Sequence, residues 1–210
     1  SMPTIAALGI VLLVAGTYVV MALLSDRPSG PVASPTPPQG GTVGTPAAAT
    51  AIAGEAADVV QSYMLFDGSD PTAFESTPDN PVRFEKDADG AGMARVSSSA
   101  GSPGVRINIG PGIADRLAGQ PVRIVIVARM ARESGAANMR FAYQSGVALS
   151  HWQPANLATA DASYGLVWRV PKMRTDPNGD YVLIEPGIPG DGTAADIRSV
   201  RVDLLAKEPG

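Results

Sequence analysis

Few side chains in this sequence could support catalysis. The chain of 210 residues contains one histidine, His151, and no cysteine. A hydrolase built on His151 would need a nucleophile and an orienting acid beside it, and the nearest candidates along the chain are Ser150 and Asp161. Sequence neighbours rarely form such a triad, and no nucleophile elbow, Walker loop or dinucleotide-binding fingerprint is present. We therefore expect no catalytic residues and a protein that is not an enzyme.

Metal binding would have to use acidic loops. The lack of cysteine and the single histidine exclude thiolate zinc sites, iron–sulfur ligation and histidine clusters. Asp176, Asn178 and Asp180 match the start of a calcium-binding loop, but Gly179 falls early and the twelfth position is Gly187 instead of Glu. The other candidate acids are Asp87, Asp89, Asp191 and Asp196. Because Asp in Gly-rich segments is ordinary turn chemistry, we predict no bound metal and no cofactor.

Sugar binding has one candidate location, around Trp152. An aromatic face can stack on a pyranose ring while polar neighbours hold its hydroxyl groups, and Trp152 is flanked by His151 and Gln153. The alternative is that His151 and Trp152 fill the end of a folded domain, because a lone Trp is more often a packing residue than a ligand contact. The other tryptophan, Trp168, belongs to a regular row of apolar residues and is predicted to lie in the core.

Short segments with a period of two follow one another from residue 82 onward. Gly, Pro, Asn and Asp divide them, and this pattern is typical of a β-sandwich or barrel. The segment 122–129 is apolar on both sides and therefore predicts a central strand that is covered on both faces. The other predicted strands lie at 105–109, 139–144, 164–170, 181–185 and 197–205.

The order of these segments resembles the galactose-binding-like jelly rolls, in particular the carbohydrate-binding modules of the family 4/9 type. The resemblance covers about residues 66–205 and rests on the layout of five segments. They are GAGMARVSSS, GVRIN, PVRIVIVARM, YGLVWRVP and ADIRSVRVDLL. It implies an all-β jelly-roll sandwich, and it gives sugar binding as an expected activity.

The N-terminal segment predicts a membrane anchor over residues 1–25. Residues 5–24 form an uncharged apolar run of 20 residues, and a helix of that length spans about 30 Å, the hydrocarbon thickness of a bilayer. A cleaved signal peptide is the alternative, but no basic segment precedes the run and no clear cleavage motif follows it. Gly9 and Gly16 lie seven residues apart and would allow a neighbouring helix to approach closely. We expect a single-pass protein of the bacterial inner membrane with its C-terminal domain in the periplasm.

Two segments join the predicted anchor to the predicted β-sandwich at 66–210. Residues 26–50 are rich in Pro, Gly and Ala and predict an extended linker. Residues 51–65 place apolar side chains at helical spacing and predict a short amphipathic helix. Together these predictions describe an all-β jelly-roll sandwich preceded by one transmembrane helix and a Pro-rich linker.

The distribution of charge favours protein or glycan partners over nucleic acid. The net charge is −4, and residues 28–82 contain six acids and no Lys or Arg, so no basic surface suits a phosphate backbone. An anchor, a tether and a domain without catalytic residues lead to our main hypothesis. It is a non-catalytic accessory subunit that docks on other subunits of a membrane complex, for example a photosynthetic or respiratory one. The alternative is a membrane-tethered carbohydrate-binding module for envelope glycans.

Overall fold

The computed structural model describes residues 59–173 and 179–207, all of which belong to one compact unit, Thr45–Gly210. The predicted anchor and linker, with Gly9 and Gly16, lie outside the described residues. Within the described part, no helix combines the length and apolar character needed to cross a bilayer.

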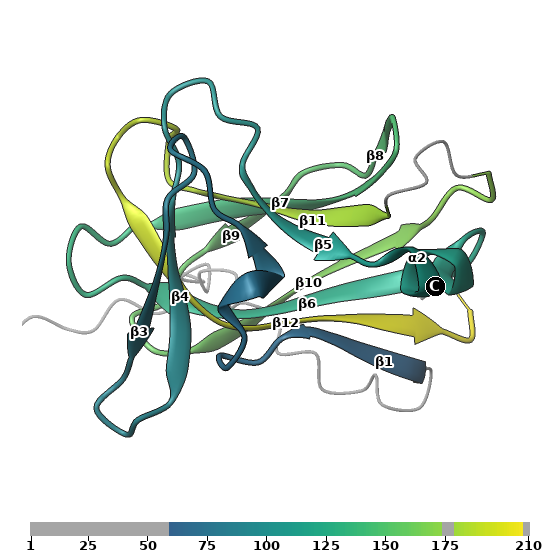
Figure 1. Ribbon diagram of the computed structural model, residues 1–210, viewed down its shortest axis with the longest axis horizontal. Coiled ribbons are helices and arrows are strands. Elements are labelled where there is room, and N and C mark those ends of the chain that lie inside the picture. The colour runs from purple at the N-terminus through teal and green to yellow at the C-terminus, as the bar shows by residue number, and fades with distance from the viewer. Residues whose placement is uncertain (1–58, 174–178, 208–210) are drawn as a thin grey trace, which may run out of the picture. The chain divides into compact units, whose positions relative to one another are not determined.

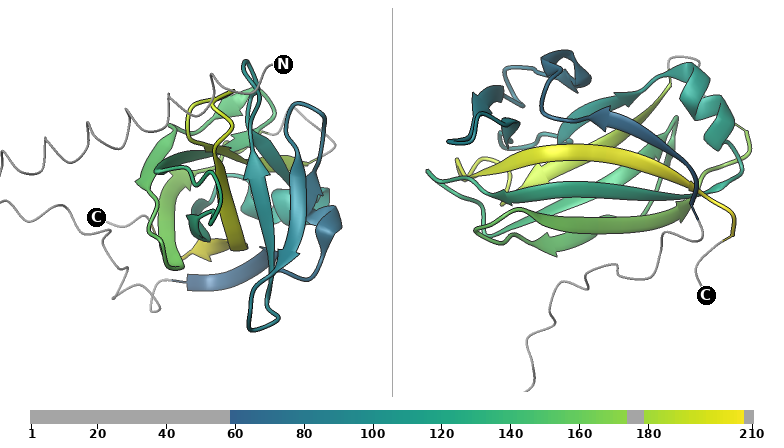
Figure 2. Two further views of the ribbon diagram at one scale, coloured as in Figure 1. Left: turned by 90° about the vertical axis from the view of Figure 1, so that its left-hand side faces the viewer. Right: turned by 90° about the horizontal axis from the view of Figure 1, so that it is seen from below.

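Two antiparallel sheets lie face to face and form a β-sandwich, as the period-two pattern predicts (Figure 1). Sheet A has the strand order β10-β6-β12-β4-β3. β1 pairs with the edge of β12 that also pairs with β4, nearer to the C-terminal end of β12. The strands of sheet A are β1 (Val59–Phe66), β3 (Val82–Lys86), β4 (Gly92–Ser97), β6 (Pro121–Met130), β10 (Ala162–Arg169) and β12 (Ala194–Leu205). Figure 2, right, shows β1, β12, β6 and β10 side by side across this sheet.

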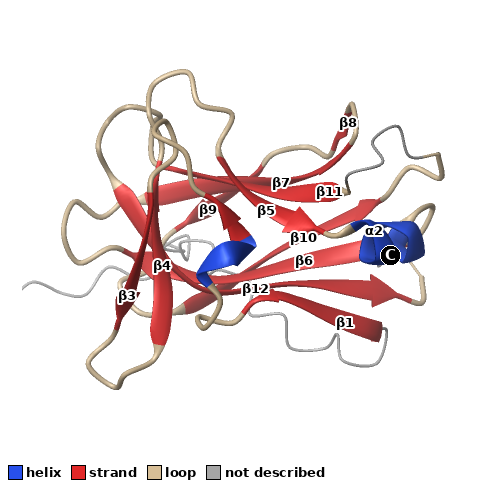
Figure 3. Ribbon diagram, in the orientation of Figure 1, coloured by secondary structure: helices blue, strands red, loops and turns tan. Residues whose placement is uncertain are grey.

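Sheet B has the order β2-β5-β11-β7-β8, and β9 also pairs with β7. Its strands are β2 (Phe74–Glu75), β5 (Val105–Ile109), β7 (Asn138–Ser145), β8 (Ala148–Leu149), β9 (Gln153–Asn156) and β11 (Asp180–Pro186). Two short helical segments complete the described part, η2 (Pro71–Ala73) and α2 (Pro111–Leu117), so strands dominate the fold (Figure 3). Ala114 and Leu117 of α2 are buried against the core.

Side chains that alternate along the strands build the core between the sheets. On β5, Val105, Ile107 and Ile109 are fully buried, whereas Arg106 and Asn108 point to the outside. The strand β6 is buried over nearly its whole length, which confirms the prediction of a central strand covered on both faces. Residues that are buried but lie outside the core cluster, such as Val125 on β6, mark the outer faces of the sheets.

The predicted helix over residues 51–65 is wrong where the structure describes it, because residues 59–66 form β1. Tyr63 lies opposite Val202 of β12 and packs on the core, whereas Ser62 lies opposite Asp203 and bonds to its carboxylate. The apolar residues of this short segment fit either period, and the backbone partners offered by β12 decide in favour of the strand. Residues 51–58 lie outside the described residues, and the sandwich begins at Val59, before the predicted boundary at residue 66.

Candidate functional site

The outer side of sheet B collects aromatic, polar and charged side chains from the strands β5, β7 and β11 and from Trp152, the residue immediately before β9. We call it the sheet B face. It consists of Arg106, Asn108, Arg140, Ala142, Gln144, Trp152, Tyr181, Leu183 and Glu185. The strand pairings place these residues in rows, because residues that lie opposite one another on neighbouring strands share a face. In one row Tyr181 of β11 lies between Asn108 of β5 and Gln144 of β7.

Small and aliphatic side chains form the floor of the sheet B face. Leu183 lies opposite both Arg106 and Ala142 in the central row. Leu183 is 4% exposed and Ala142 is fully buried, although neither belongs to the core cluster between the sheets. Their taller neighbours on the same face therefore shield them from solvent. A flat apolar floor with polar groups at its rim is the arrangement expected of a ligand-binding surface.

One rim of this floor is formed by Arg106 and Tyr181. The guanidinium carbon of Arg106 lies 5.4 Å from the centroid of the Tyr181 ring, within the range of a cation–π contact. The two side chains come from neighbouring strands, and Arg106 lies diagonally across from Tyr181. Both are half-buried, so the tyrosine ring is held in place and remains partly accessible.

The other rim combines Trp152, Arg140 and Glu185. The guanidinium carbon of Arg140 lies 4.7 Å from the centroid of the Trp152 ring. The same guanidinium donates to both carboxylate oxygens of Glu185, with Nε–Oε1 at 2.8 Å and Nη2–Oε2 at 3.0 Å. Glu185 is 2% exposed, so a bidentate charge-assisted pair holds a buried carboxylate at the edge of the floor. Arg140 thus links a ring beside β9 with an acid on β11.

The structure separates the three residues predicted to bind sugar. Trp152 is half-buried and contributes to the sheet B face. Gln153 lies opposite Phe141, a core residue, and its amide donates to the carbonyl oxygen of Pro154. The side chain of His151 is exposed, and its backbone carbonyl accepts a hydrogen bond from Ser150 Oγ. Of the three, only Trp152 has a described contact with other side chains of this face.

Sequence reasoning missed Arg106, Arg140, Tyr181 and Glu185 as members of a site. Each occupies an outward position in an alternating strand, and that signal is visible in the sequence. The strand order β5-β11-β7 is what brings them together, and a single sequence does not state which strands are neighbours.

The residues considered for a hydrolytic triad are not brought together. Ser150 is buried, and its hydroxyl accepts from the backbone N–H of Tyr143 and donates to the His151 carbonyl oxygen. Asp161 instead pairs with Arg198 on sheet A, with Nε–Oδ2 at 3.1 Å. Ser150, His151 and Asp161 therefore do not lie together as a nucleophile, a base and an acid.

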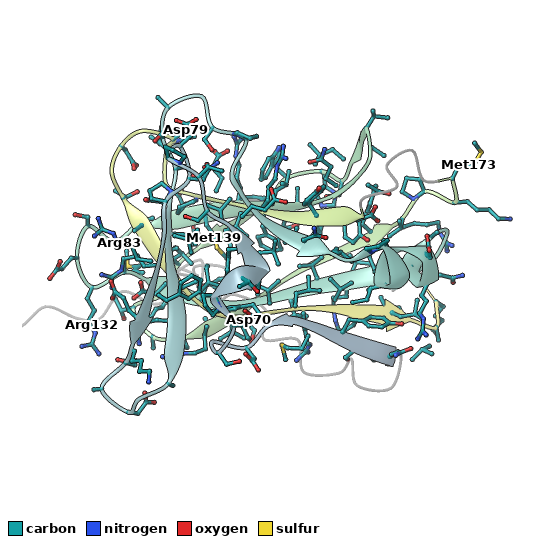
Figure 4. All side chains as sticks on the ribbon, viewed as in Figure 1. Asp70, Asp79, Arg83, Arg132, Met139 and Met173 are labelled. Atoms are coloured by element: carbon teal, nitrogen blue, oxygen red, sulfur yellow. The ribbon has the colours of Figure 1, made fainter. Side chains whose placement is uncertain are left out.

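The acids considered for calcium are occupied by protein groups. Asp87 accepts hydrogen bonds from Arg129, Arg132 and Arg198, each at 2.9 Å. The bond from Arg129, followed by those from the backbone N–H of Ala88 and from Arg198, holds the pKa of Asp87 far below its usual value of 3.8. Three guanidinium groups around one carboxylate leave no place for a cation. This cluster lies at the end of the sandwich that carries Arg132, opposite the end that carries Met173 (Figure 4).

The remaining acids serve turns or ion pairs. The carboxylate of Asp196 accepts hydrogen bonds from Nε and Nη2 of Arg95, with distances of 2.8 and 3.2 Å to Oδ1 and Oδ2. Asp191 accepts from the backbone N–H groups of Ile188 and Thr193, which lowers the pKa of its carboxyl. Asp89 accepts from the N–H of Ala91. Asp176 and Asn178 lie outside the described residues. In the described ranges, no three His, Asp or Glu side chains are grouped so that they could hold a metal ion.

Comparison with known proteins identifies the fold. No protein-family model matches the chain, and no curated protein does. Among solved structures, the CBM22-1 xylan-binding domain of Xyn10C from Paenibacillus barcinonensis has a TM-score of 0.51 at 10% identity, with 72% of this chain and 97% of that chain covered. The C-terminal family 22 carbohydrate-binding module of Xyn10B from Clostridium thermocellum has a TM-score of 0.50 at 12% identity, with 74% of this chain and 99% of that one covered. The chain therefore has the jelly-roll β-sandwich fold of carbohydrate-binding modules, which confirms the predicted resemblance.

Proposed function

We propose that the protein binds glycan chains on the sheet B face and that it does so without catalysis. The observation that carries this proposal is the placement of Trp152 and Tyr181 on either side of a buried apolar floor. Tyr181 lies on β11, and Trp152 precedes β9, with β7 between them. Neighbouring strands are about 4.8 Å apart, so the rings flank a strip roughly two strands wide. Such a strip suits consecutive sugar rings that stack on aromatic faces.

The polar groups around the floor supply the hydrogen bonds that a sugar needs. Sugar hydroxyl groups both donate and accept, and the sheet B face offers both functions. Gln144 and Asn108 carry amides beside Tyr181. Glu185 is 2% exposed and orients the guanidinium of Arg140 through two bonds. Because its pair with Arg140 uses Nε and Nη2, the Nη1 group of Arg140 remains to donate to a ligand.

The fold likeness favours this function over that of a docking subunit. Two proteins with the same fold are carbohydrate-binding modules, and one of them is a xylan-binding domain. The identities of 10–12% support the fold alone, so the assignment to glycan depends on the residues of the sheet B face. A β-linked polysaccharide such as xylan is the first ligand to test, with xylohexaose as its soluble probe.

Titration calorimetry with xylohexaose, cellohexaose and a panel of polysaccharides tests the proposal on the full-length chain. We expect Trp152→Ala to weaken binding between about twofold and tenfold, because stacking on an aromatic ring contributes about 0.5–1.5 kcal/mol. Phe84→Ala is the matched control, since Phe84 is a partly exposed aromatic residue on sheet A. Unchanged affinity in Trp152→Ala, or equal losses in both variants, would contradict the proposal.

We also propose that residues 1–25 hold this module at the bacterial inner membrane with the domain in the periplasm. Its support is the uncharged apolar run of residues 5–24 in the sequence. Reporter fusions at the C-terminus and protease protection in spheroplasts test the topology. Copurification of defined partner subunits from solubilised membranes tests the hypothesis of an accessory subunit, and recovery of the protein alone counts against that hypothesis.

A further inference from the structure

The strand β1 differs from the other edge strands of the described sandwich. Edge strands expose unpaired backbone groups, and proteins protect them with charged residues, prolines, β-bulges or very short lengths. In sheet A, β3 carries Arg83, Glu85 and Lys86, and β10 ends with Arg169. In sheet B, β9 contains Pro154, and β2 and β8 have two residues each. β1 has eight residues, VVQSYMLF, with no charge and no proline.

The outward side chains of β1 are apolar and exposed. Ser62 points outward, because its hydroxyl donates to Asp203 on the outer face of sheet A. Val60 and Met64 lie two residues to either side of Ser62, and they are 63% and 56% exposed. One edge of β1 pairs with β12, and the second edge pairs with no other described strand. β1 follows β12 in unbroken register from Gln61 to Met64. The pairing is irregular between Val59 and Gln61, where Val60 lies, and between Met64 and Phe66.

We propose that two copies of this chain associate by antiparallel pairing of β1 with β1. A two-fold axis that passes beside Ser62 places Val60 of each copy opposite Met64 of the other. The two exposed apolar residues of the strand thereby cover each other, which is the self-complementarity that an isologous interface requires. The absence of charge on β1 removes the repulsion that would oppose such pairing.

The pairing would extend sheet A from one copy into the next. Opposite residues on paired strands share a face, so the two outer faces of sheet A lie on one side of the joined sheet. Sheet B of each copy then lies on the other side, and both sheet B faces point in the same direction. A dimer of this kind would offer two copies of the proposed glycan site to one surface, and this consequence alone depends on the proposed function.

Cysteine cross-linking tests the predicted register, because the native chain contains no cysteine. Val60→Cys and Met64→Cys are made as separate full-length variants in detergent micelles and are then mixed under mild oxidation. We expect the mixture to form disulfide-linked dimers several-fold more than either variant alone, because Val60 meets only Met64 of the other copy. Ser163→Cys, an exposed serine on the edge strand β10 of the same sheet, is the matched control and should not cross-link.

Charge exchange provides a second test that does not depend on a chemical bond. Val60→Lys with Met64→Lys should weaken self-association more than tenfold in sedimentation velocity, and so should Val60→Glu with Met64→Glu. An equimolar mixture of the two double variants should restore dimers through opposite charges across the interface. A native chain that stays monomeric at 100-micromolar concentrations, equal cross-linking of Ser163→Cys, or a failure of the mixture to recover dimers would overturn the proposal.

Discussion

Both outer faces of the sandwich carry arginine, but the arginines have different partners. On the outer face of sheet A, Arg123 and Arg201 both pair with Asp203, with N–O distances of 2.9 and 3.1 Å. A second cluster joins Arg95, Arg129 and Arg198 to Asp87, Asp161 and Asp196. On the sheet B face, Arg106 and Arg140 lie over the rings of Tyr181 and Trp152, and only Arg140 also holds an acid.

On the outer face of sheet A, the charged groups are neutralised by one another, whereas the sheet B face leaves aromatic and polar groups accessible to a ligand. Asp203 is fully buried and Arg123 is 5% exposed, so their charges are compensated within the protein. Buried charges of this kind are expensive to leave unpaired, although the intact pair adds little net stability. Around the floor of the sheet B face, half-buried rings, amides and guanidinium groups stay accessible. We therefore attribute a role in stability to the outer face of sheet A, and this contrast supports the proposal that the sheet B face binds a ligand.

The largest effect is expected on sheet A. Asp203→Ala leaves the buried Arg123 without its carboxylate partner and should cost about 3–5 kcal/mol in the free energy of unfolding. Urea denaturation of the full-length chain measures this loss. Glycan affinity, measured below the midpoint of unfolding, should stay within twofold of the native value. A loss below about 1 kcal/mol would show that solvent or a local shift compensates the arginine.

On the sheet B face, we expect a substitution to lower glycan affinity more than it lowers stability. Glu185→Gln keeps the shape of the side chain and removes the charge that Arg140 holds. Because the Arg140 side chain is 49% exposed, the free energy of unfolding should fall by no more than about 1 kcal/mol. The affinity for xylohexaose should fall about tenfold, since Arg140 loses the charged partner that orients it and a charged hydrogen bond to a ligand contributes about 1.5 kcal/mol. Native affinity in this variant would remove Glu185 from the proposed site.

The acid dependence of stability should arise mainly from the sheet A cluster around Asp87. Its pKa in the folded protein is held below the usual 3.8 by Arg129 and its neighbours, so its contribution is complete above that pH and is lost as the pH falls through the lower folded value. Asp87→Asn should therefore flatten the decline of the melting temperature between about pH 5 and pH 2. The Asp67, Asp70 and Asp191 carboxyls also have lowered pKa values, so some decline should remain. An unchanged slope would contradict this role.

The smallest effect is expected for a single amide at the rim. Gln144→Ala removes one side chain beside Tyr181 and should weaken glycan binding about threefold to fivefold, the loss of one neutral hydrogen bond. The melting temperature should not change, because Gln144 is only half-buried. Gln61→Ala, which removes an exposed amide on β1 of sheet A, serves as a matched control with no expected change. Equal effects in the two variants would show that this row does not contact the ligand.

The sequence alone allowed the sandwich and one site residue to be predicted, and the reasons differ from element to element. The alternation of Val105, Ile107 and Ile109 with Arg106 and Asn108 identifies both a strand and its outer side. The segment around Val59 to Met64 fits a helix and a strand equally well, and its pairing with β12 decides between them. Trp152 stands out by residue type, but Arg140 and Glu185 reach it only through the pairing of β11, β7 and β9.

The assignment of ligand binding to one face is tested most directly by amide chemical shifts of the full-length protein during titration with xylohexaose. We predict that the perturbed amides lie on β5, β7 and β11 and include the indole N–H of Trp152, while β1, β6 and β12 remain unchanged. Shifts that concentrate on sheet A, or no shifts with any glycan of the panel at millimolar concentration, would contradict the account.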